Sequence, residues 1–514
     1  MALQTEGRDG FMAGKLQRPI LVGGIGLSVA LALWEGLDRS TGDIGEWGIL
    51  GAIAVGAGAW LLRPRVPELD LSPMPAVCDR AIVEKEFAKT QATIDRFAEQ
   101  MKELDASESE VNASIAPFTE DLDRLKTSLE RTAIDIAIVG GKSTGKTSLL
   151  AALESARSAK NSELELNFDE IPALFTSEEP TEETTAFPSE LTADIVVFLV
   201  SGDITEPEFG AVESLRAAGY KTILVSNKQD RYPSDEQAAI LQQLQQRMQG
   251  LVDPEDIASV AASPAPLKVR QHQPDASVEE RLETQPPQIN TLAQRLESVA
   301  QDEREPLVFA TTVRHAKSLR ARVKQELDRL RRDRAMPIIA QYQWIAGAAA
   351  LANPVPALDL LATGAVSGQL VMDLGEIYQQ KFSLEQAKVT ATNLGSIMVK
   401  LGLVELSTQT ISAMLKTNAV TYLAGGAVQG VSAAYLTRIV GLSLIEYFQQ
   451  QEVVPTVEKN QGLNLDALAE IVKRVFAENQ RTAFVRSFAT QALDRLSPKL
   501  KPESNSSNNL AANH

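Results

Sequence analysis

Cysteine and histidine are scarce in this 514-residue sequence, which contains one cysteine and three histidines. The single cysteine, Cys78, excludes an internal disulfide and a zinc site built from several thiolates of one chain. The three histidines, the last of them His514, leave little material for a histidine metal site or a catalytic triad. The scarcity of both residue types favours a reducing compartment and phosphate chemistry.

Positive charge is also in deficit, and aromatic residues make up only 5% of the chain. The formal net charge is −17 and the sequence pI is near 4.9. This balance argues against a nucleic-acid partner that is bound through bulk charge. Hydrophobic residues, at 44% of the chain, are numerous enough to build cores. A chain of this length is expected to form about two or three domains.

The sequence is organised around a glycine-rich turn between an apolar run and a helix-forming run. Ile134–Val139 is short and β-branched, and the pattern G-x-x-x-x-G-K-[ST] follows it directly. A strand before and a helix after are the context in which this pattern predicts a phosphate-binding loop. Lys146 is expected to reach the β- and γ-phosphates, and Thr147 to ligate Mg²⁺ through its hydroxyl. The predicted nucleotide contacts of the loop are Gly140, Gly141, Lys142, Ser143, Thr144, Gly145, Lys146, Thr147 and Ser148.

A second motif, Asn227-Lys228-Gln229-Asp230, ends an apolar run later in the chain. In an N-K-x-D pattern the aspartate accepts hydrogen bonds from the N1–H and the 2-amino group of guanine, and adenine offers no such pair of donors. Asn227 is expected to brace the loop, and the Lys228 stem to cover the base. Ala262 and Ser263 fall where a backbone N–H would meet the guanine O6. These residues predict guanine as the base.

Further apolar runs predict buried strands that are separated by helical patterns. They are Leu164–Phe168, Ile195–Val200, Thr222–Val225 and Ile257–Ala262. Such alternation is typical of an α/β fold with a doubly wound, mostly parallel sheet. We therefore expect a P-loop domain of this class over residues 132–305.

Some of these stretches together resemble the Era/dynamin-like branch of the Ras-type GTPases. They are Gly140–Thr147, Ala193–Phe198 and Asn227–Asp230. Within that branch the chain resembles the YcjF-type family, in which a hydrophobic helical domain of unknown function follows the GTPase. Ala350–Asp359 and Gly375–Tyr378 carry this second likeness. The resemblance spans about Ala133 to Phe448 and implies GTP or GDP and Mg²⁺ as ligands.

The likeness is incomplete where such GTPases sense the γ-phosphate. They usually carry a switch threonine and then a D-x-x-G turn, but no second threonine lies between Thr147 and Asp169. The nearest counterpart of the turn begins at Asp169, the predicted magnesium-side carboxylate, and lacks the glycine. Asp203 is a rival one strand later, and an unusual loop offers Thr181, Thr184 and Thr185. The sequence therefore predicts GTP binding and leaves hydrolysis and switching open.

Two apolar segments near the N-terminus are each close to the length that crosses a bilayer. They are Pro19–Leu37 and Trp47–Leu62. Basic residues precede the first and follow the second, so the positive-inside rule predicts a membrane hairpin with both ends in the cytoplasm. The alternative for the first segment is a signal peptide, since Ala30-Leu31-Ala32 resembles a cleavage site. Export would separate the nucleotide-binding domain from its nucleotide, which favours the hairpin.

Residues 67–131 are acidic and follow a helical pattern. One apolar seam consists of Ile115, Phe118, Leu122, Leu125 and Leu129, and an earlier one of Phe87, Ile94, Phe97, Met101 and Leu104. One interpretation is a helical hairpin packed on its own domain. The other is a stalk or self-association surface between the membrane and the nucleotide site.

Arg314–Arg334 is predicted to form a basic amphipathic helix. Its cations are Arg314, Lys317, Arg320, Arg322, Lys324, Arg329, Arg331, Arg332 and Arg334. Because an apolar region follows, we interpret the helix either as a juxtamembrane patch that faces anionic lipid or as a solvated helix face. Nucleic-acid binding is a third interpretation, which the acidic chain disfavours.

Met336–Phe448 is rich in alanine, glycine, valine and leucine. Small residues such as Gly430 permit close helix contacts, whereas Asp359, Asp373 and Arg438 would be costly at a bilayer centre. We expect an all-α bundle that is either soluble or, as we favour, membrane-associated. A further amphipathic helix pair is predicted after it, over Leu465–Leu496.

These patterns divide the chain into successive parts. They are 1–66 with two transmembrane helices, 67–131 as an acidic helical hairpin, 132–305 as the GTPase domain, 306–500 as the basic helix and hydrophobic helical domain, and 501–514 as a disordered tail. The leading hypothesis is an integral membrane protein that binds GTP on the cytoplasmic side and couples nucleotide state to the helical domain. The alternatives are a non-hydrolysing membrane adaptor and a dynamin-like membrane-remodelling assembly. The expected partners are guanine nucleotide, lipid membrane, and a second copy or another protein that binds the helical regions.

Overall fold

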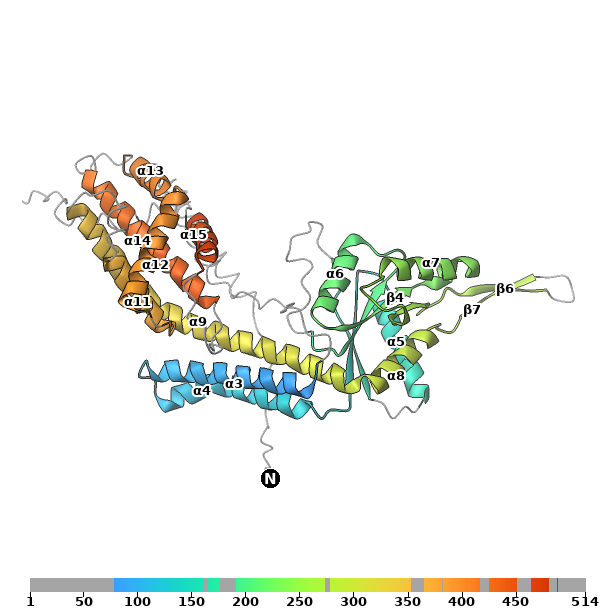
Figure 1. Ribbon diagram of the computed structural model, residues 1–514. Coiled ribbons are helices and arrows are strands. Elements are labelled where there is room, and N and C mark those ends of the chain that lie inside the picture. Colours follow the sequence, from blue (N-terminus) through green and yellow to red (C-terminus); the bar gives the residue numbers. More distant parts are fainter. Residues whose placement is uncertain are drawn as a thin grey trace, which may run out of the picture.

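The computed structural model describes residues 78–160, 165–175, 191–272, 278–352, 365–380, 382–416, 425–450, 464–479 and 488. Several predictions concern residues outside these ranges: the N-terminal membrane hairpin, the segment with Thr181, Thr184 and Thr185, Asp359, and the C-terminal tail. Within the described ranges the chain forms an α/β unit and a helical unit, which three long helices join (Figure 1).

The α/β unit contains a five-stranded sheet in the order β2-β1-β3-β4-β5, and every strand pair in it is parallel. The strands are β1 (Ile134–Gly140), β2 (Leu166–Glu170), β3 (Ile195–Val200), β4 (Lys221–Asn227) and β5 (Ile257–Val260). All residues of β3 are buried, as expected for a continuous apolar run covered on both faces.

Helices cover both faces of this sheet, so the predicted doubly wound α/β architecture is confirmed for this unit. On one face, α5 (Lys146–Lys160) and α8 (Asn290–Asp302) pack on Ile136 and Ile138 of β1. On the other face, α6 (Glu206–Ala217) and α7 (Ser234–Arg247) pack on Phe198 of β3. Short 3₁₀ helices, η2 (Gln229–Arg231) and η3 (Pro254–Asp256), lie before α7 and β5.

One hairpin has no counterpart in the sequence prediction. β6 (Leu267–His272) and β7 (Val278–Glu283) form a separate antiparallel sheet. Half of the positions in its strands are charged, and the strands lack the sustained alternation of apolar and polar residues from which a strand is predicted. Most strands of the main sheet were predicted because they are buried apolar runs; β2, in which only Leu166 is buried, is the exception.

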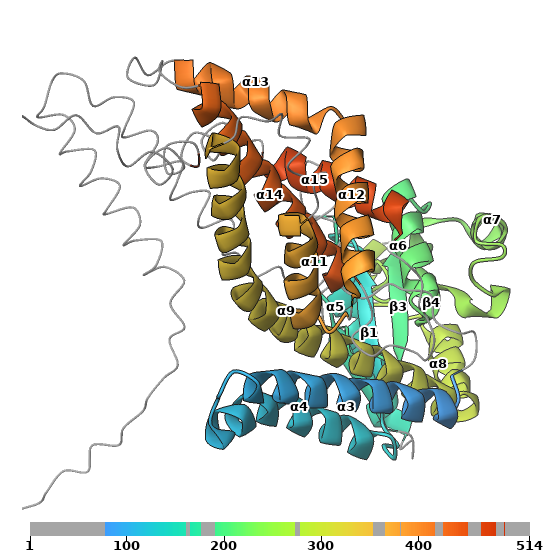
Figure 2. The ribbon, with the colours of Figure 1, turned by 60° about the vertical axis from the view of Figure 1, so that its left-hand side comes forward.

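The three joining helices form a strut, by which we mean α3 (Arg80–Lys102), α4 (Glu108–Ser128) and the first part of α9 (Arg304–Ala352). Both views show α3 and α4 alongside α9 (Figures 1 and 2). Their common core includes Phe97, Leu122 and Leu319. The predicted seams of the acidic hairpin thus face α9, except that Leu104 is 42% exposed. The hairpin is packed on its own chain.

The acidic hairpin covers part of the basic stretch of α9, an arrangement that neither sequence interpretation included, while Arg329 and Arg332 remain exposed. Three of its cations form ion pairs with the acidic hairpin: Arg320 with Glu86 at 2.9 Å, Arg322 with Asp121 at 2.8 Å, and Arg334 with Glu103 at 3.3 Å. Arg314 and Arg331 are buried. Helical periodicity identifies a charged face but does not reveal that an acidic hairpin from elsewhere in the chain covers it.

The helical unit packs around the second half of α9. Its helices are α11 (Ala365–Ile377), α12 (Leu384–Lys400), α13 (Leu403–Lys416), α14 (Gly425–Gln449) and α15 (Leu465–Asn479). α9 and α14 lie side by side (Figure 2). At Gly430 a Cβ atom would lie 2.9 Å from the Gly347 carbonyl oxygen, so glycine permits this close approach.

Among the described helices, one passes the length and composition test for a membrane span, Val428–Gln449 in α14, and 83% of its most apolar window is buried inside the fold. α12 and α13, bent by 67°, pass the same test together. Two of the polar contacts within the unit join its helices: the Tyr342 hydroxyl donates to Asp373 at 2.7 Å, and Arg438 donates to Gln343 at 3.5 Å.

Candidate nucleotide-binding site

The glycine-rich loop lies at the carboxyl edge of the sheet, between the end of β1 and the first turn of α5. Glycine is required at two of its positions. A Cβ at Gly140 would lie 2.5 Å from the Leu199 carbonyl oxygen, and one at Gly145, where φ is +98°, would lie 2.3 Å from Asn227 Nδ2. The loop therefore presses closely against β3 and β4, and it leads into the N-terminus of α5, where backbone N–H groups lack helical partners.

The Lys146 side chain folds back over the loop. Its ammonium donates to the carbonyl oxygens of Gly140 at 3.2 Å and Gly141 at 3.1 Å. Burial lowers the pKa of this ammonium, and the nearby carboxylate of Glu170 acts in the opposite direction. Backbone carbonyls are weaker partners for a cation than phosphate oxygens are. The ammonium is therefore positioned to exchange these carbonyls for a phosphate.

Asn227 links the two predicted motifs. Its side-chain amide donates to the Thr144 carbonyl oxygen at 2.9 Å, so it braces the loop. Its Oδ1 accepts hydrogen bonds from the backbone N–H groups of Lys228 at 2.8 Å and Ala262 at 3.1 Å. The Ala262 N–H, which we expected to meet the guanine O6, thus contacts the protein, while Ser263 beside it is exposed.

Lys228 and Asp230 lie at the mouth of the same site. The Lys228 backbone is left-handed, with φ at 67°, and its ammonium donates to the Ser143 carbonyl oxygen at 2.6 Å. Asp230 Oδ2 accepts a hydrogen bond from the Ala265 N–H at 3.1 Å. This bond orients the carboxylate and, within the described residues, leaves Oδ1 for a ligand.

On the magnesium side, the structure differs from the sequence prediction by one residue. Thr147 Oγ1 donates to Glu170 Oε1 at 3.0 Å. Because side chains alternate along a strand, Asp169, which precedes Glu170 in β2, points to the opposite face of the sheet. The carboxylate next to Thr147 is therefore that of Glu170.

This shift also moves the turn that follows. The counterpart of D-x-x-G becomes Glu170-Ile171-Pro172-Ala173, with alanine in the glycine position. Hydrogen bonds from Ile171 to Ile138 at 3.0 Å and from Leu174 to Gly140 at 3.2 Å hold the segment along β1.

The rival aspartate, Asp203, has other partners. Its Oδ2 pairs with Arg247 of α7 at 2.9 Å, and its Oδ1 accepts the Ile204 N–H. The described ranges contain no group of three or more His, Cys, Asp or Glu side chains that could hold a metal. The Thr147 hydroxyl and the Glu170 carboxylate fit Mg²⁺, which proteins commonly bind through one or two side chains together with substrate phosphates and water.

A second polar cluster lies at the amino edge of the sheet, and the sequence reading missed it. Asp194 Oδ1 accepts hydrogen bonds from Arg131 and from Thr311 of α9, and Oδ2 accepts the Asp135 N–H at 2.9 Å. The Arg314 guanidinium donates to the Gly219 and Ala193 carbonyl oxygens, at 2.9 and 3.1 Å. These contacts attach α9 to the sheet.

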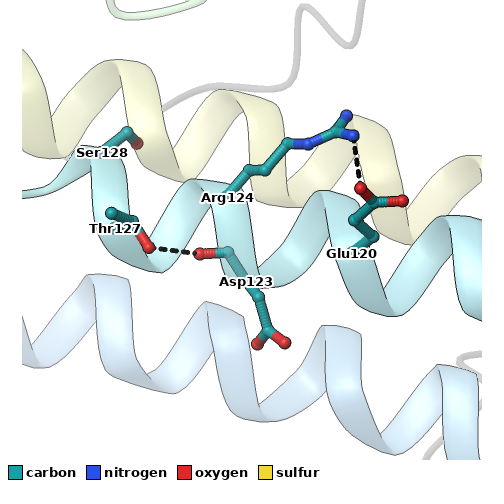
Figure 3. A pocket seen from close by; sticks show the side chains of 5 residues that line it. All are labelled: Glu120, Asp123, Arg124, Thr127 and Ser128. Carbon is teal, nitrogen blue, oxygen red and sulfur yellow. Dashed lines mark hydrogen bonds and ion pairs between the residues drawn. The ribbon is translucent and has the colours of Figure 1, made fainter.

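A shallow pocket on α4 lies on the strut (Figure 3). Its lining residues are Glu120, Asp123, Arg124, Thr127 and Ser128. All of them belong to one helix, and Arg124 is already paired with Glu120 at 2.7 Å. Because no second element contributes a converging group, the pocket adds nothing to the nucleotide site.

Comparison with known families identifies the helical unit. Residues 314–481 match the family described as a domain of unknown function, DUF697. This match confirms the part of the resemblance that concerns the helical domain; it does not extend over residues 132–305, where the GTPase domain is predicted. No curated protein matches the chain.

Two solved structures illustrate how distant the structural likenesses are. LeoA, a bacterial dynamin GTPase from ETEC, is 15% identical, with 80% of this chain and 95% of that chain covered and a TM-score of 0.22. A chain of an oligomerised bacterial dynamin pair, described as sensing and tethering membranes, is 12% identical, with 81% and 76% covered and a TM-score of 0.23. The roles of the site residues therefore rest on the geometry of this chain alone.

Proposed function

We propose that this chain is a membrane-associated GTP-binding protein in which the nucleotide state is coupled to the DUF697 helical domain. One observation carries the proposal: the phosphate-loop motif and the N-K-x-D motif are hydrogen-bonded to each other. Asn227 contacts Thr144, and Lys228 contacts Ser143. A phosphate cradle and a guanine-specific aspartate therefore belong to one site.

In this proposal each motif has a defined role. The backbone N–H groups of Gly140 to Ser148 and the Lys146 ammonium hold the phosphates, while Asp230 selects guanine and the Lys228 stem covers the base. Thr147 ligates Mg²⁺ through its hydroxyl. We assign to Glu170, in place of Asp169, the carboxylate that orients a magnesium-bound water. Ser263, in place of Ala262, supplies the backbone N–H for the guanine O6.

Calorimetry on the full-length chain with Mg²⁺ and GTP, GDP or ATP tests this assignment. We expect binding of both guanine nucleotides and roughly 100-fold weaker binding of ATP, because Asp230 recognises two donors that adenine lacks. Asp230→Asn should abolish the preference, whereas Asp235→Asn on the exposed start of α7 should leave it intact. An unchanged preference in Asp230→Asn would show that another group reads the base.

The membrane part of the proposal rests on the apolar segments Pro19–Leu37 and Trp47–Leu62 together with the span-length apolar helix in α14. We propose an N-terminal membrane hairpin with the GTPase domain in the cytoplasm. Protease protection in sealed vesicles tests the orientation: residues after Arg65 should be digested from the cytoplasmic side only. Release of the intact chain by alkaline carbonate would contradict an integral anchor.

Coupling is proposed to run through α9. This helix contacts the sheet at Thr311 and continues into the helical unit beside α14. α3 contacts both neighbours at its C-terminal end, because Gln100 accepts a hydrogen bond from Arg331 at 3.0 Å and donates to the Ile377 carbonyl oxygen at 3.1 Å. A displacement of the sheet that moves α9 would thus be transmitted to the helical unit along α9 and α3.

A second candidate function is a membrane adaptor that binds GTP without hydrolysing it. Ala173 in the glycine position favours this candidate, because its Cβ restricts the backbone conformations by which a glycine at this position turns its N–H toward the γ-phosphate. GTP turnover measured with and without liposomes separates the two. Lipid-stimulated hydrolysis that Lys146→Ala abolishes would exclude the adaptor, and GTP binding without turnover would support it.

A further inference from the structure

The β6–β7 hairpin stands apart from the rest of the α/β unit. It forms its own two-stranded sheet and projects away from the body of the molecule (Figure 1). Its described side chains, from Leu267 to Arg270 and from Glu280 to Glu283, are all exposed. Leu267 is 55% and Leu282 70% exposed. An isolated two-stranded hairpin is only marginally stable in water, so a hairpin this exposed is expected to gain stability from a partner.

Both outer edges of the hairpin are available for pairing. No other strand in the described part of the chain pairs with β6 or β7. The edge strands therefore present backbone N–H and C=O groups on which a further strand can be added. Neither strand contains a proline, the residue that most simply blocks such an edge.

The charges of the two strands are segregated. β6 carries the cations Lys268 and Arg270, both of which pair with Glu280 of β7 within the hairpin. The described part of β7 carries the anions Glu280 and Glu283 against the single cation Arg281. Charged edge residues are a common protection against edge-to-edge aggregation. Here they oppose pairing of β6 with β6 or of β7 with β7, because like charges directly opposite destabilise a strand pair. They favour pairing of β6 with β7.

We propose that the hairpin is a self-association surface on which the β6 edge of one copy pairs with the β7 edge of a second copy. Such an interface is heterologous, since it uses two different edges. Each copy therefore keeps one free β6 or β7 edge, and the contact extends into rings or filaments instead of stopping at a twofold dimer. The second copy is the occupant that fits because it supplies the complementary charge pattern. The proposal does not depend on guanine binding.

The hairpin's base connects it to the candidate nucleotide site. Before β6, the Ala265 N–H donates to Asp230 at 3.1 Å. After β7, Gln288 exchanges backbone hydrogen bonds with Ala261 at 2.9 and 3.0 Å, and its side chain accepts from Gln229 at 3.2 Å. A second copy bound to the hairpin thus lies one short segment from the residues that are assigned to the base.

Capture between two differently tagged forms of the full-length chain, in detergent micelles, tests the proposal. The variant K268E/R270E/E280K/E283K exchanges the charges of the two edges. It preserves the pairing of charges within the hairpin, where Arg270 contacts Glu280 at 2.9 Å, so the hairpin is expected to fold. The matched control is E120R/R124E, which exchanges an exposed pair on α4.

We expect wild type to capture wild type and the four-charge variant to capture itself. Capture of the variant by wild type should fall roughly tenfold, since several like-charge contacts then oppose each pairing. The control should mix freely with wild type. Equal capture of the four-charge variant by wild type and by itself, or no capture of wild type by wild type, would overturn the proposal.

Discussion

The two edges of the five-stranded sheet carry the same kinds of polar side chain, yet they have different properties. At the carboxyl edge, Lys146 and Lys228 donate to backbone carbonyl oxygens of a loop, and Asp230 is partly exposed. At the amino edge, Asp194 and Arg314 are buried. Asp194 accepts hydrogen bonds from Arg131 and from Thr311 of α9, and Arg314 donates to two backbone carbonyl oxygens.

The difference lies in whether a charged group can exchange its partner. A lysine that is bound to backbone carbonyls can take a phosphate oxygen without leaving any charge unpaired. A buried carboxylate that is bound to an arginine and a threonine cannot lose either partner without a large desolvation penalty. The carboxyl edge is therefore suited to bind a ligand, and the amino edge is suited to fix α9 to the sheet.

Removal of Asp194 should produce the largest effect. Asp194→Ala leaves Arg131 and Thr311 without their shared acceptor, and breaking a buried ion pair typically costs about 3–5 kcal/mol. Denaturant unfolding followed by circular dichroism measures the loss. The matched control is Asp135→Ala, which removes the other carboxylate bound to Arg131, one that is 40% exposed. Equal losses for the two variants would contradict a structural role that is specific to the buried edge.

The pH dependence of stability should test the amino edge of the sheet through the titration of His315. Burial, with the charges of Arg314 and Arg131 adding to it, lowers the pKa of His315 to about 4. Since the unfolded histidine titrates near 6.5, the unfolded state binds more protons between these values, and stability falls as the pH drops through this window. The loss amounts to roughly 3 kcal/mol at most.

Thermal unfolding of wild type and His315→Gln from pH 7 to pH 4 measures this contribution. The variant lacks the titrating group and should lose less stability than wild type over the same range. Parallel curves for the two proteins would mean that the pKa of His315 is the same in the folded and unfolded states, so that burial does not lower it.

At the carboxyl edge, Lys146→Ala should weaken Mg²⁺–GTP binding while the folded state is retained. Loss of a charge-assisted contact of about 1.5–3 kcal/mol corresponds to roughly 10- to 150-fold in affinity. Calorimetry gives the affinity, and Lys142→Ala is the matched control because Lys142 is an exposed lysine of the same loop. If Lys146→Ala instead destabilised the fold as much as Asp194→Ala, the contrast between the edges would not hold.

The smallest effect is expected on the strut, where charged residues are paired but remain partly solvated. Arg322 and Asp121 lie 2.8 Å apart, with side chains 38% and 29% exposed. A double-mutant cycle with Arg322→Ala and Asp121→Ala should give a coupling of at most about 1 kcal/mol. The coupling should fall as salt is added. A coupling energy as large as the loss of stability in Asp194→Ala would show that this exposed pair is as stabilising as the buried amino edge.

The parts of the site that sequence reading located well are those in which function depends on neighbours along the chain. The phosphate loop follows its own strand and precedes its own helix, so local pattern alone places Gly140 to Thr147 at a strand end. Ile195–Val200 coincides with β3 because every residue of that run is buried. The helical domain was anticipated from the likeness of Ala350–Asp359 and Gly375–Tyr378 to the YcjF-type family.

Features of the site that a local pattern does not determine depend on pairing between distant segments. The choice between Asp169 and Glu170 depends on how β2 pairs with β1, and a shift of one residue reverses which side chain faces Thr147. The pairing of Ile138 in β1 with Glu170 in β2 sets that register. The role of Arg320 depends on Glu86, which lies on a helix far away in sequence.

The sequence by itself therefore determined the chemistry this chain offers: a phosphate loop, a guanine motif, an acidic hairpin, a basic helix and an apolar bundle. Only the tertiary structure decided which of these charges remain available. Ion pairing is a through-space interaction, so the acidic hairpin could neutralise the basic helix only after both had packed on a common core. The lysines at the carboxyl edge have partners that a phosphate can replace, because these partners are backbone carbonyl oxygens. Every sequence supplies such oxygens.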